Sequence, residues 1–374
     1  MSDSRPLRFG IVGCGGAALP VAQALAASPV TALAAAYDLN PDLARDVAER
    51  FGATAHASLV SLLSSAAVEA VYIAVPHHQL ASLAAQALRA GKHVLVEKPM
   101  ALSLAEADDL IVLAEARGLG LGVNYDLRQS AQAVQARALI RAGAIGPVVA
   151  VRIQTLIDKP ASYWRAGYSG RWVNSWRASQ TQAGGGVVLM NSSHQLDIVR
   201  FITGLEVVSV SGEIGTLAVP PELAEVAMEV EDTASASLRY STGAIGSLLA
   251  GAHLAGSEAG SERLELYGTH GQLRMPSLYG DDPVQLFLRR AWGEPALAAH
   301  ELPSGEWHRL PHAPADKFQG TVEAFARAVQ RGEPPAPNGR DARAVLAIIL
   351  GLYQASATHT VQPIDHLEVQ HAGH

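Results

Sequence analysis

The sequence predicts an α/β protein whose N-terminal part is a doubly wound parallel sheet and whose C-terminal part is a second, strand-containing domain. The chain has 374 residues, which suffices for two domains with a core each. Over the first third, short apolar segments alternate with segments of helical pattern, as in parallel sheets covered by helices. Further along, several segments alternate apolar and polar residues as half-exposed strands do.

Apolar runs and their stop signals locate the elements of the first third. Asn40 and Pro41 supply an N-cap and a proline at the first helical position. Ser103 and Glu106 have the spacing of a capping box, and Pro76 ends an apolar run. We expect strands over residues 7–13, 30–38, 70–75, 93–96 and 118–123, and helices that end near residues 27, 51, 90 and 117.

A glycine-rich turn follows the first expected strand directly and precedes a helix. Its sequence, GCGGAA at 13–18, fits the GxGxxA variant of a dinucleotide-binding turn, in which backbone N–H groups and a helix N-terminus face a pyrophosphate. Asp38 ends the next strand, where a carboxylate can accept from a ribose 2′-hydroxyl and repel a 2′-phosphate. The alternative for Asp38 is a residue that only precedes a helix. The pattern predicts NAD rather than NADP, bound by Gly13, Gly15, Gly16, Ala17 and Asp38.

Two further strand ends should meet the same cofactor, because ligands of doubly wound sheets bind beyond the carboxyl ends of the strands. The residues at those ends are Val75 and Pro76, and then Glu97 and Lys98. Desolvation can lower the pKa of such a lysine toward useful acid–base chemistry. On spacing alone, a surface lysine after a strand is the better interpretation of Lys98.

The segment GGGVVLMNSSHQLD at 184–197 places three glycines before an apolar helix that should stop at Gly204. His194 and Asp197 are three residues apart and share one face of that helix. They are either a solvated helix face or a site that handles protons.

The segment 163–179 is rich in aromatic residues and arginines. Aromatic faces pack on the C–H faces of sugars, and arginines donate to hydroxyls or carboxylates. The same residue types also anchor subunit contacts. We favour a substrate lid that includes Trp176 and Arg177. The residues concerned are Tyr163, Trp164, Tyr168, Trp172 and Trp176, with Arg165, Arg171 and Arg177 between them.

Charge and composition exclude several classes of partner. The net charge of −7 argues against nucleic acid and anionic membranes. The strongly apolar run 344–353 is too short to span a bilayer, no signal-peptide core is visible near residue 1, and Cys14 is the single cysteine. We therefore expect a cytoplasmic protein. The histidines of the tail after residue 358 are irregularly spaced and lack cysteines, so we expect no metal site there.

Taken together, these motifs resemble the Gfo/Idh/MocA family, named after glucose-fructose oxidoreductase and myo-inositol dehydrogenase. The resemblance covers nearly the whole chain and includes AGKHVLVEKPMALSLAEADDL at 90–110 and FQGTVEAFARAVQRGEPP at 318–335. It implies a Rossmann domain over 1–128 and an α+β domain over 129–374 with an open, mostly antiparallel sheet, helices at about 317–358 and a flexible tail after about 360. The alternating segments 148–155, 207–215, 234–240 and 262–268 agree with such a sheet, with hairpin turns at Gly243 and Gly271.

The resemblance also implies a site that oxidises a carbinol, with Lys98 and His194 as the acid–base pair. Many members carry an aspartate four residues before that histidine, where this chain has Met190. We therefore expect two proton-handling residues, with Asn191 and Asp197 orienting substrate hydroxyls or the imidazole. In place of the P-N-x-x-H that often follows Val75 in members, this chain has Pro76-His77-His78. The two histidines either line the cofactor cleft or are polar loop residues, and we favour the second interpretation.

Three functions remain open at this stage. The first is an NAD-dependent dehydrogenase or reductase of a sugar, anhydrosugar, glycoside or cyclitol, working as a homodimer or homotetramer. The second is a glycoside-cleaving enzyme in which tightly held NAD oxidises a ring carbon transiently. The third is a non-catalytic sugar or dinucleotide sensor, against which the presence of both Lys98 and His194 argues.

Overall fold

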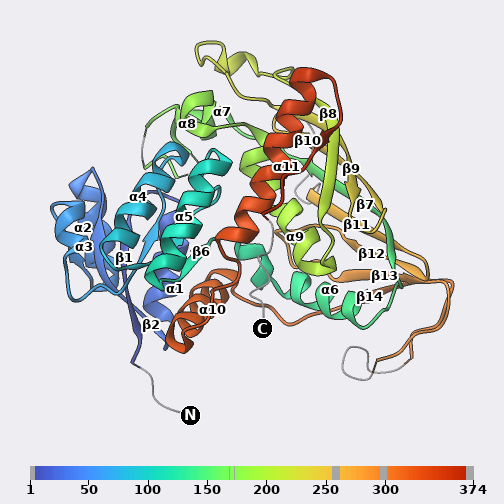
Figure 1. Ribbon diagram of the computed structural model, residues 1–374, viewed down its shortest axis with the longest axis horizontal. Coiled ribbons are helices and arrows are strands. Elements are labelled where there is room, and N and C mark those ends of the chain that lie inside the picture. The colour runs from blue at the N-terminus through green and yellow to red at the C-terminus, as the bar shows by residue number, and fades with distance from the viewer. Residues whose placement is uncertain (1–4, 168, 172, 255–261, 295–300, 368–374) are drawn as a thin grey trace.

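The computed structural model describes residues 5–167, 169–171, 173–254, 262–294 and 301–367. Figure 1 shows two sheets side by side, the N-terminal one covered by helices and the second one open on its far side. The first sheet has six strands, all parallel, in the order β3-β2-β1-β4-β5-β6. Its strands are β1 (Leu7–Val12), β2 (Thr31–Tyr37), β3 (Thr54–Ala55), β4 (Ala70–Ile73), β5 (His93–Val96) and β6 (Leu121–Val123).

Two helices of this half begin at the caps that the sequence predicts. The Asn40 side chain accepts from the backbone N–H of Asp42, and that of Ser103 accepts from Glu106. The Glu106 carboxylate accepts from Leu102 rather than from Ser103, so the capping box is incomplete. The helices are α1 (Ala18–Ala27), α2 (Pro41–Phe51), α3 (Leu59–Leu63), α4 (His77–Arg89) and α5 (Leu104–Arg117).

The second sheet has nine strands in the order β14-β13-β12-β11-β7-β10-β9-β8-β15, antiparallel except for the pair β7–β10. The four expected strands are present, and Gly243 forms the expected turn between β9 and β10 with a φ of 87°. Gly271 is the first residue of β12 instead of a turn residue. The strands are β7 (Val148–Leu156), β8 (Val207–Gly215), β9 (Thr233–Tyr240), β10 (Ile245–Gly251), β11 (Glu262–Gly268), β12 (Gly271–Met275), β13 (Val284–Leu288), β14 (Trp307–Leu310) and β15 (Gln362–Pro363).

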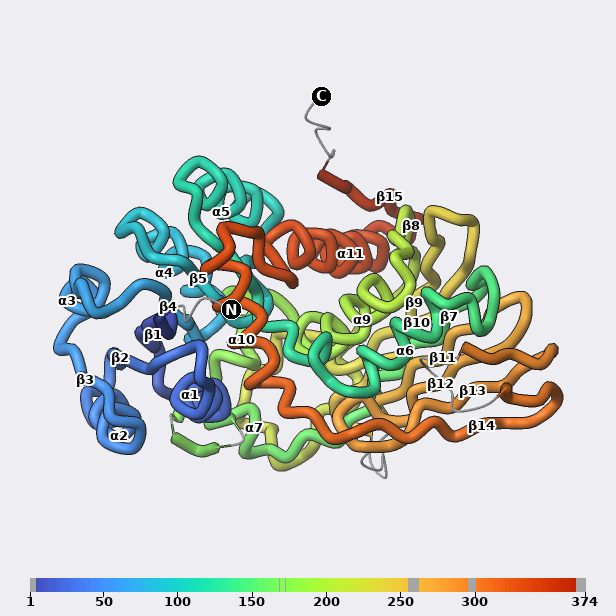
Figure 2. Tube along the Cα trace, turned by 90° about the horizontal axis from the view of Figure 1, so that it is seen from below, coloured from blue at the N-terminus to red at the C-terminus, as the bar shows by residue number. Residues whose placement is uncertain are grey.

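Helices join the two sheets. The 20-residue helix α11 packs against β8 of the second sheet and against α5 of the first half, and it crosses between them in Figures 1 and 2. No helix among the described residues is long and apolar enough to cross a membrane. The remaining helical segments are η1 (Asp126–Gln129), α6 (Ala131–Arg141), α7 (Ala161–Ala166), η2 (Trp176–Ala178), α8 (Gln180–Ala183), η3 (Val188–Ser192), α9 (Ser193–Thr203), η4 (Pro221–Leu223), α10 (Lys317–Arg331) and α11 (Gly339–Thr358).

Helix α10 returns to the N-terminal half and completes its core. The Phe325 ring lies 5.7 Å from the Phe9 ring between centroids, and both side chains are buried. Val322 and Ala326 join the same apolar cluster as β1, α1 and α2. A division at residue 128 therefore leaves out a helix on which the core of the first half depends.

Candidate active site

The glycine turn after β1 is fixed by close packing on β4 and by Asp38. Gly13 has a φ of 89°, and a Cβ there would lie 2.3 Å from the carbonyl oxygen of Ala74. Only glycine fits such a position. The Asp38 carboxylate accepts from the N–H of Cys14 at 2.7 Å and from the N–H of Asn40 at 2.8 Å. The turn and the carboxylate at the end of β2 therefore form one rigid unit.

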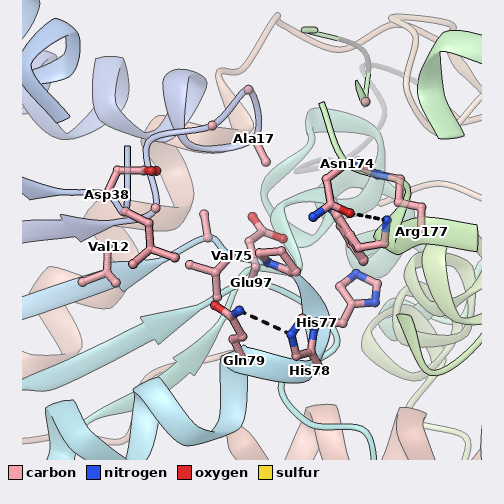
Figure 3. A pocket seen from close by; sticks show the side chains of 18 of the residues that line it. Val12, Ala17, Asp38, Val75, His77, His78, Gln79, Glu97, Asn174 and Arg177 are labelled. Atoms are coloured by element: carbon pink, nitrogen blue, oxygen red, sulfur yellow. Dashed lines mark hydrogen bonds between the residues drawn. The ribbon is translucent and has the colours of Figure 1, made fainter. Parts of the chain in front are cut away.

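A cavity of about 650 Å³ runs from this unit along the carboxyl ends of the strands. Figure 3 shows Asp38 at one end, Val75 and Glu97 in the middle, and Asn174 and Arg177 at the other end. An elongated cavity with a helix N-terminus and a carboxylate at one end fits a dinucleotide. All nine residues expected to contact the cofactor line it: Gly13, Gly15, Gly16, Ala17, Asp38, Val75, Pro76, Glu97 and Lys98.

Lys98 stands where the cavity passes the end of β5. Glu97 beside it is held by Tyr72 at 2.5 Å and by Asn124 at 2.6 Å. The Lys98 Nζ donates to the backbone carbonyl of Met190 at 2.6 Å. Burial and the charge of Lys159 lower the pKa of Lys98, while Glu97 partly offsets them. Lys98 therefore faces the cavity with a more readily lost proton than a surface lysine has.

Close contacts explain the three glycines before the histidine helix. Only Gly184 has a left-handed backbone, with a φ of 80°. A Cβ on Gly186 would lie 1.8 Å from the carbonyl oxygen of Glu231, and a Cβ on Gly185 would lie 2.0 Å from the hydroxyl of Tyr353. The buried Glu231 carboxylate accepts from the N–H groups of Gly186 and Val188. The glycines allow Glu231 to cap this helix at contact distance.

The helix itself differs from the regular one that the apolar pattern predicts. Residues 188–192 form a π-helical turn, in which the N–H of Ser193 donates to the carbonyl of Val188, and the α-helix α9 begins only at Ser193. A π-helical turn inside a helix is rare and is frequent at functional sites. Here it presents the carbonyl of Met190 to Lys98.

His194 lies one turn beyond Met190, between two aromatic rings. The ring centroids of Tyr125 and Tyr279 are 5.8 and 6.0 Å from that of the imidazole, both edge-on. The His194 Nδ1 lies 3.8 Å from a carboxylate oxygen of Asp126, whose other oxygen is 2.8 Å from the Nζ of Lys317. Burial, Lys98 and Lys317 hold the pKa of His194 well below its usual value. The imidazole is therefore neutral at pH 7 and can accept a proton.

The sequence reasoning missed Asp126, Tyr279 and Lys317 around His194. The sequence carries a signal for Asp126 alone, because this residue follows β6 closely and so lies at the carboxyl edge of the sheet. Tyr279 and Lys317 reach the site from loops and from α10, about 85 and 123 positions after His194, and no local pattern marks them.

Asp197 does not take the place that the sequence predicts. Its carboxylate accepts from Arg128 at 2.5 and 2.7 Å, and both side chains are buried. A buried bidentate pair leaves this carboxylate no face toward substrate or imidazole. The buried side-chain oxygen of Asn191 has no hydrogen-bond partner among the described residues. Asn191 and Asp197 are not among the residues that line the cavity, and His194 is likewise absent from the lining, one turn beyond Met190, which belongs to it. The geometry thus gives no support to the expected roles of Asp197 and Asn191 in binding substrate.

The aromatic segment after Pro160 forms one wall of the cavity. The Trp176 ring lies 4.6 Å from that of His77, and the Arg177 guanidinium lies 4.5 Å above the Trp176 ring. Arg171 reaches across to Asp46 on α2 at 2.7 Å. The segment therefore spans the cavity from the second domain to the first. Tyr168 and Trp172, named in the same expectation, lie outside the described residues.

The interpretation of His77 and His78 as loop residues is wrong. Both begin α4 and line the cavity (Figure 3). The Nδ1 of His77 lies 2.8 Å from the carbonyl of Ala183, so it carries the proton and donates. Burial and the charge of Lys98 lower the pKa of His77 to about 3. This side chain is a neutral part of the wall.

Comparison with known proteins agrees with this geometry. Residues 7–125 match the family described as "Oxidoreductase family, NAD-binding Rossmann fold", and residues 133–274 match the "GFO/IDH/MocA C-terminal domain". The chain is 29% identical over 313 residues to 1,5-anhydro-D-fructose reductase of Ensifer adhaerens, covering 82% of this chain and 83% of that one. It is 24% identical to myo-inositol 2-dehydrogenase of Thermotoga maritima, covering 92% and 94%.

Solved structures show the same fold. Levoglucosan dehydrogenase in complex with NADH superimposes with a TM-score of 0.84 over 97% of this chain and 100% of that chain, at 22% identity.

Proposed function

Because the chain belongs to the Gfo/Idh/MocA family of oxidoreductases, we propose that it interconverts a carbinol and a carbonyl on a sugar, anhydrosugar, glycoside or cyclitol. The observation that carries this proposal is Lys98 at the end of β5, which donates to the carbonyl of Met190 inside the cavity. This hydrogen bond connects the wall of the cavity expected to bind the dinucleotide to the helix that carries His194.

Two residues divide the proton chemistry. His194, neutral because burial and two lysines lower its pKa, accepts the proton of the reacting hydroxyl when the alcohol is oxidised. Lys98, with its own pKa lowered, donates a hydrogen bond to the same oxygen and so stabilises the charge that develops there. NAD, when bound, takes up the hydride that leaves the carbinol carbon.

The cofactor is NAD in preference to NADP. Asp38 lies at the end of β2 with its carboxylate in the cavity wall. Its oxygens accept hydrogen bonds from two backbone N–H groups. A carboxylate has about four lone-pair sites, so this one can also accept from a ribose 2′-hydroxyl. A 2′-phosphate would meet like charge at that position.

The substrate is a carbohydrate or polyol. Relatives are named for anhydrofructose, levoglucosan and myo-inositol, which are all rings that carry secondary hydroxyls. The wall formed by Trp176 and Arg177 offers an aromatic face for C–H groups and a donor for hydroxyls. We infer that the segment around these residues covers the bound substrate.

A panel of cyclitols, aldoses, anhydrosugars and glycosides tests the proposal, with NADH absorbance as the readout. We expect stoichiometric NADH from at least one ring polyol and a preference for NAD over NADP. A glycoside that is cleaved with no net NADH would assign the chain to redox-assisted glycoside cleavage. Binding of NAD without turnover of any member of the panel would overturn a catalytic function.

A further inference from the structure

Met190 has no polar group on its side chain, so another residue must supply any further hydrogen bond to the reacting oxygen at this place in the site. Met190, at the position where the family resemblance implies an aspartate in many members, lines the cavity, and its backbone carbonyl accepts from Lys98. The Asp197 carboxylate is bound by Arg128, so it does not replace the missing group. The polar atom beside the Met190 side chain is instead the hydroxyl of Tyr163.

The hydroxyl oxygen of Tyr163, on α7, lies 3.5 Å from the sulfur of Met190, and the Tyr163 side chain also lines the cavity. The Lys98 Nζ contacts the carbonyl of the same Met190. The tyrosine hydroxyl and the lysine ammonium thus approach the cavity on either side of one residue.

Cations surround the Tyr163 ring. The Lys159 Nζ lies 3.6 Å from the ring centroid, and the Arg177 guanidinium lies 4.9 Å from it. Lys159 is almost fully buried, with 3% of its surface exposed. Such an arrangement stabilises the phenolate relative to the phenol, and therefore makes the phenol a stronger hydrogen-bond donor.

We propose that Tyr163 is a third catalytic residue, whose hydroxyl donates a hydrogen bond to the oxygen of the reacting carbon from the side that an aspartate at position 190 would occupy. This rests on the proposed function. The proton of the substrate hydroxyl still passes to His194, so Tyr163 neither gains nor loses a proton during the reaction. Its contribution is to stabilise negative charge on the oxygen as the O–H bond breaks.

The charges around Tyr163 determine the direction in which the reaction rate changes with pH. Although burial opposes it, the charges of Lys159, Arg177 and Lys98 lower the pKa of Tyr163 below its usual value. Above that pKa the phenolate cannot donate and repels the developing oxyanion. The rate should therefore fall as pH rises through the pKa of Tyr163.

A titration that needs no substrate tests the electrostatic part. The absorbance of the tyrosinate is followed with pH in the NAD complex, as the difference between the wild type and Tyr163→Phe. The first phenolate to form on raising the pH should disappear in Tyr163→Phe, and Lys159→Met should move its appearance to higher pH. Other buried tyrosines do not interfere, because burial raises the pKa of each: Tyr72, Tyr125, Tyr240 and Tyr353.

Kinetics test the catalytic part on the best substrate of the panel. Removal of one oxyanion donor typically costs about 10²–10³ in kcat, and we expect Tyr163→Phe to lose that factor with NADH affinity unchanged. The alkaline fall of kcat should also become smaller in this variant, because only the part caused by deprotonation of Lys98 remains. Tyr267→Phe removes the hydroxyl of a tyrosine on β11 that is bonded to Glu265, and it serves as the control with normal kcat.

Each result decides something. A Tyr163 that titrates no earlier than the other tyrosines overturns the inference, as does a Tyr163→Phe enzyme with near-normal kcat and an unchanged alkaline limb. Failure of the whole panel to yield NADH would instead overturn the proposed function, and the titration would still report on the state of Tyr163.

Discussion

The two ends of the cavity are built in opposite ways. At the Asp38 end, the decisive hydrogen bonds join residues 24 and 2 positions apart in the chain. At the Lys98 end, they join residues 92 positions apart for Lys98 and Met190, and 106 for His77 and Ala183. One end is a local motif. The other exists only after the whole chain has folded.

This difference predicts where substitutions act. Changes at the local end should alter cofactor choice and leave the rest of the site in place. Changes at the assembled end should alter chemistry or stability, because each side chain there depends on partners from distant elements.

The largest expected effect is at Lys98. Lys98→Met removes both the donor to the reacting oxygen and a cation next to His194, so kcat should fall by about 10²–10⁴ while NADH affinity stays near normal. Steady-state kinetics and fluorescence titration with NADH measure the two quantities. Lys92→Met is the control. Lys92 lies just before the N-terminal end of β5, away from the cavity, and donates to the carbonyls of Ser65 and Val68. An equal loss of kcat in both variants would show that the fall does not come from the place of Lys98 in the cavity.

The next effect concerns stability. Asp197→Ala leaves the buried Arg128 without its bidentate partner and with only the Asp341 carboxylate at 3.2 Å. The free energy of unfolding should therefore fall by an amount at or below the lower end of about 3–5 kcal/mol, the cost of a fully unpaired buried charge. Chemical denaturation measures it. The double variant Arg128→Met/Asp197→Leu should recover most of the loss, because it removes the buried pair while Asp341 keeps its contact with Arg200. A single variant that unfolds like the wild type would show that this pair does not hold α9 in place.

At the local end, Asp38→Ser should narrow the preference for NAD over NADP by about tenfold, which is about 1.4 kcal/mol. The reason is the loss of negative charge where a 2′-phosphate would lie. The ratio of kcat/KM for the two cofactors measures it. A simultaneous large fall in kcat with NAD would mean that the local end also controls the chemistry.

The smallest effect sharpens the role of His194. Lys317→Met removes a cation that lowers the pKa of His194 and frees the Asp126 carboxylate beside it. Both changes raise that pKa, so the acid limb of kcat/KM, where activity is lost as the imidazole becomes protonated, should move to higher pH by roughly one unit or less. A shift to lower pH would exclude His194 as the proton acceptor.

The same contrast explains what the sequence could predict. The parallel sheet, the glycine turn and Asp38 were predicted because strand ends and turn chemistry are local. The role of Lys98 was implied only by the family resemblance, because on spacing alone a surface lysine was the better interpretation. Short strands such as β3 and β15 were not predicted, since two residues carry no periodicity. The partner of Asp197 was also missed, because Arg128 is a distant residue whose side chain no spacing rule connects to α9.

The packing of Phe325 on Phe9 has a consequence for biosynthesis. A nascent chain that has left the ribosome as far as residue 128 contains every strand of the first sheet, yet α10, which covers Phe9, is still some 190 residues from being made. The nucleotide-binding half therefore keeps one apolar face exposed to solvent and to chaperones until the ribosome has synthesised α10. Completion of this core is therefore coupled to the synthesis of α10 and not to that of the last strand of the first sheet.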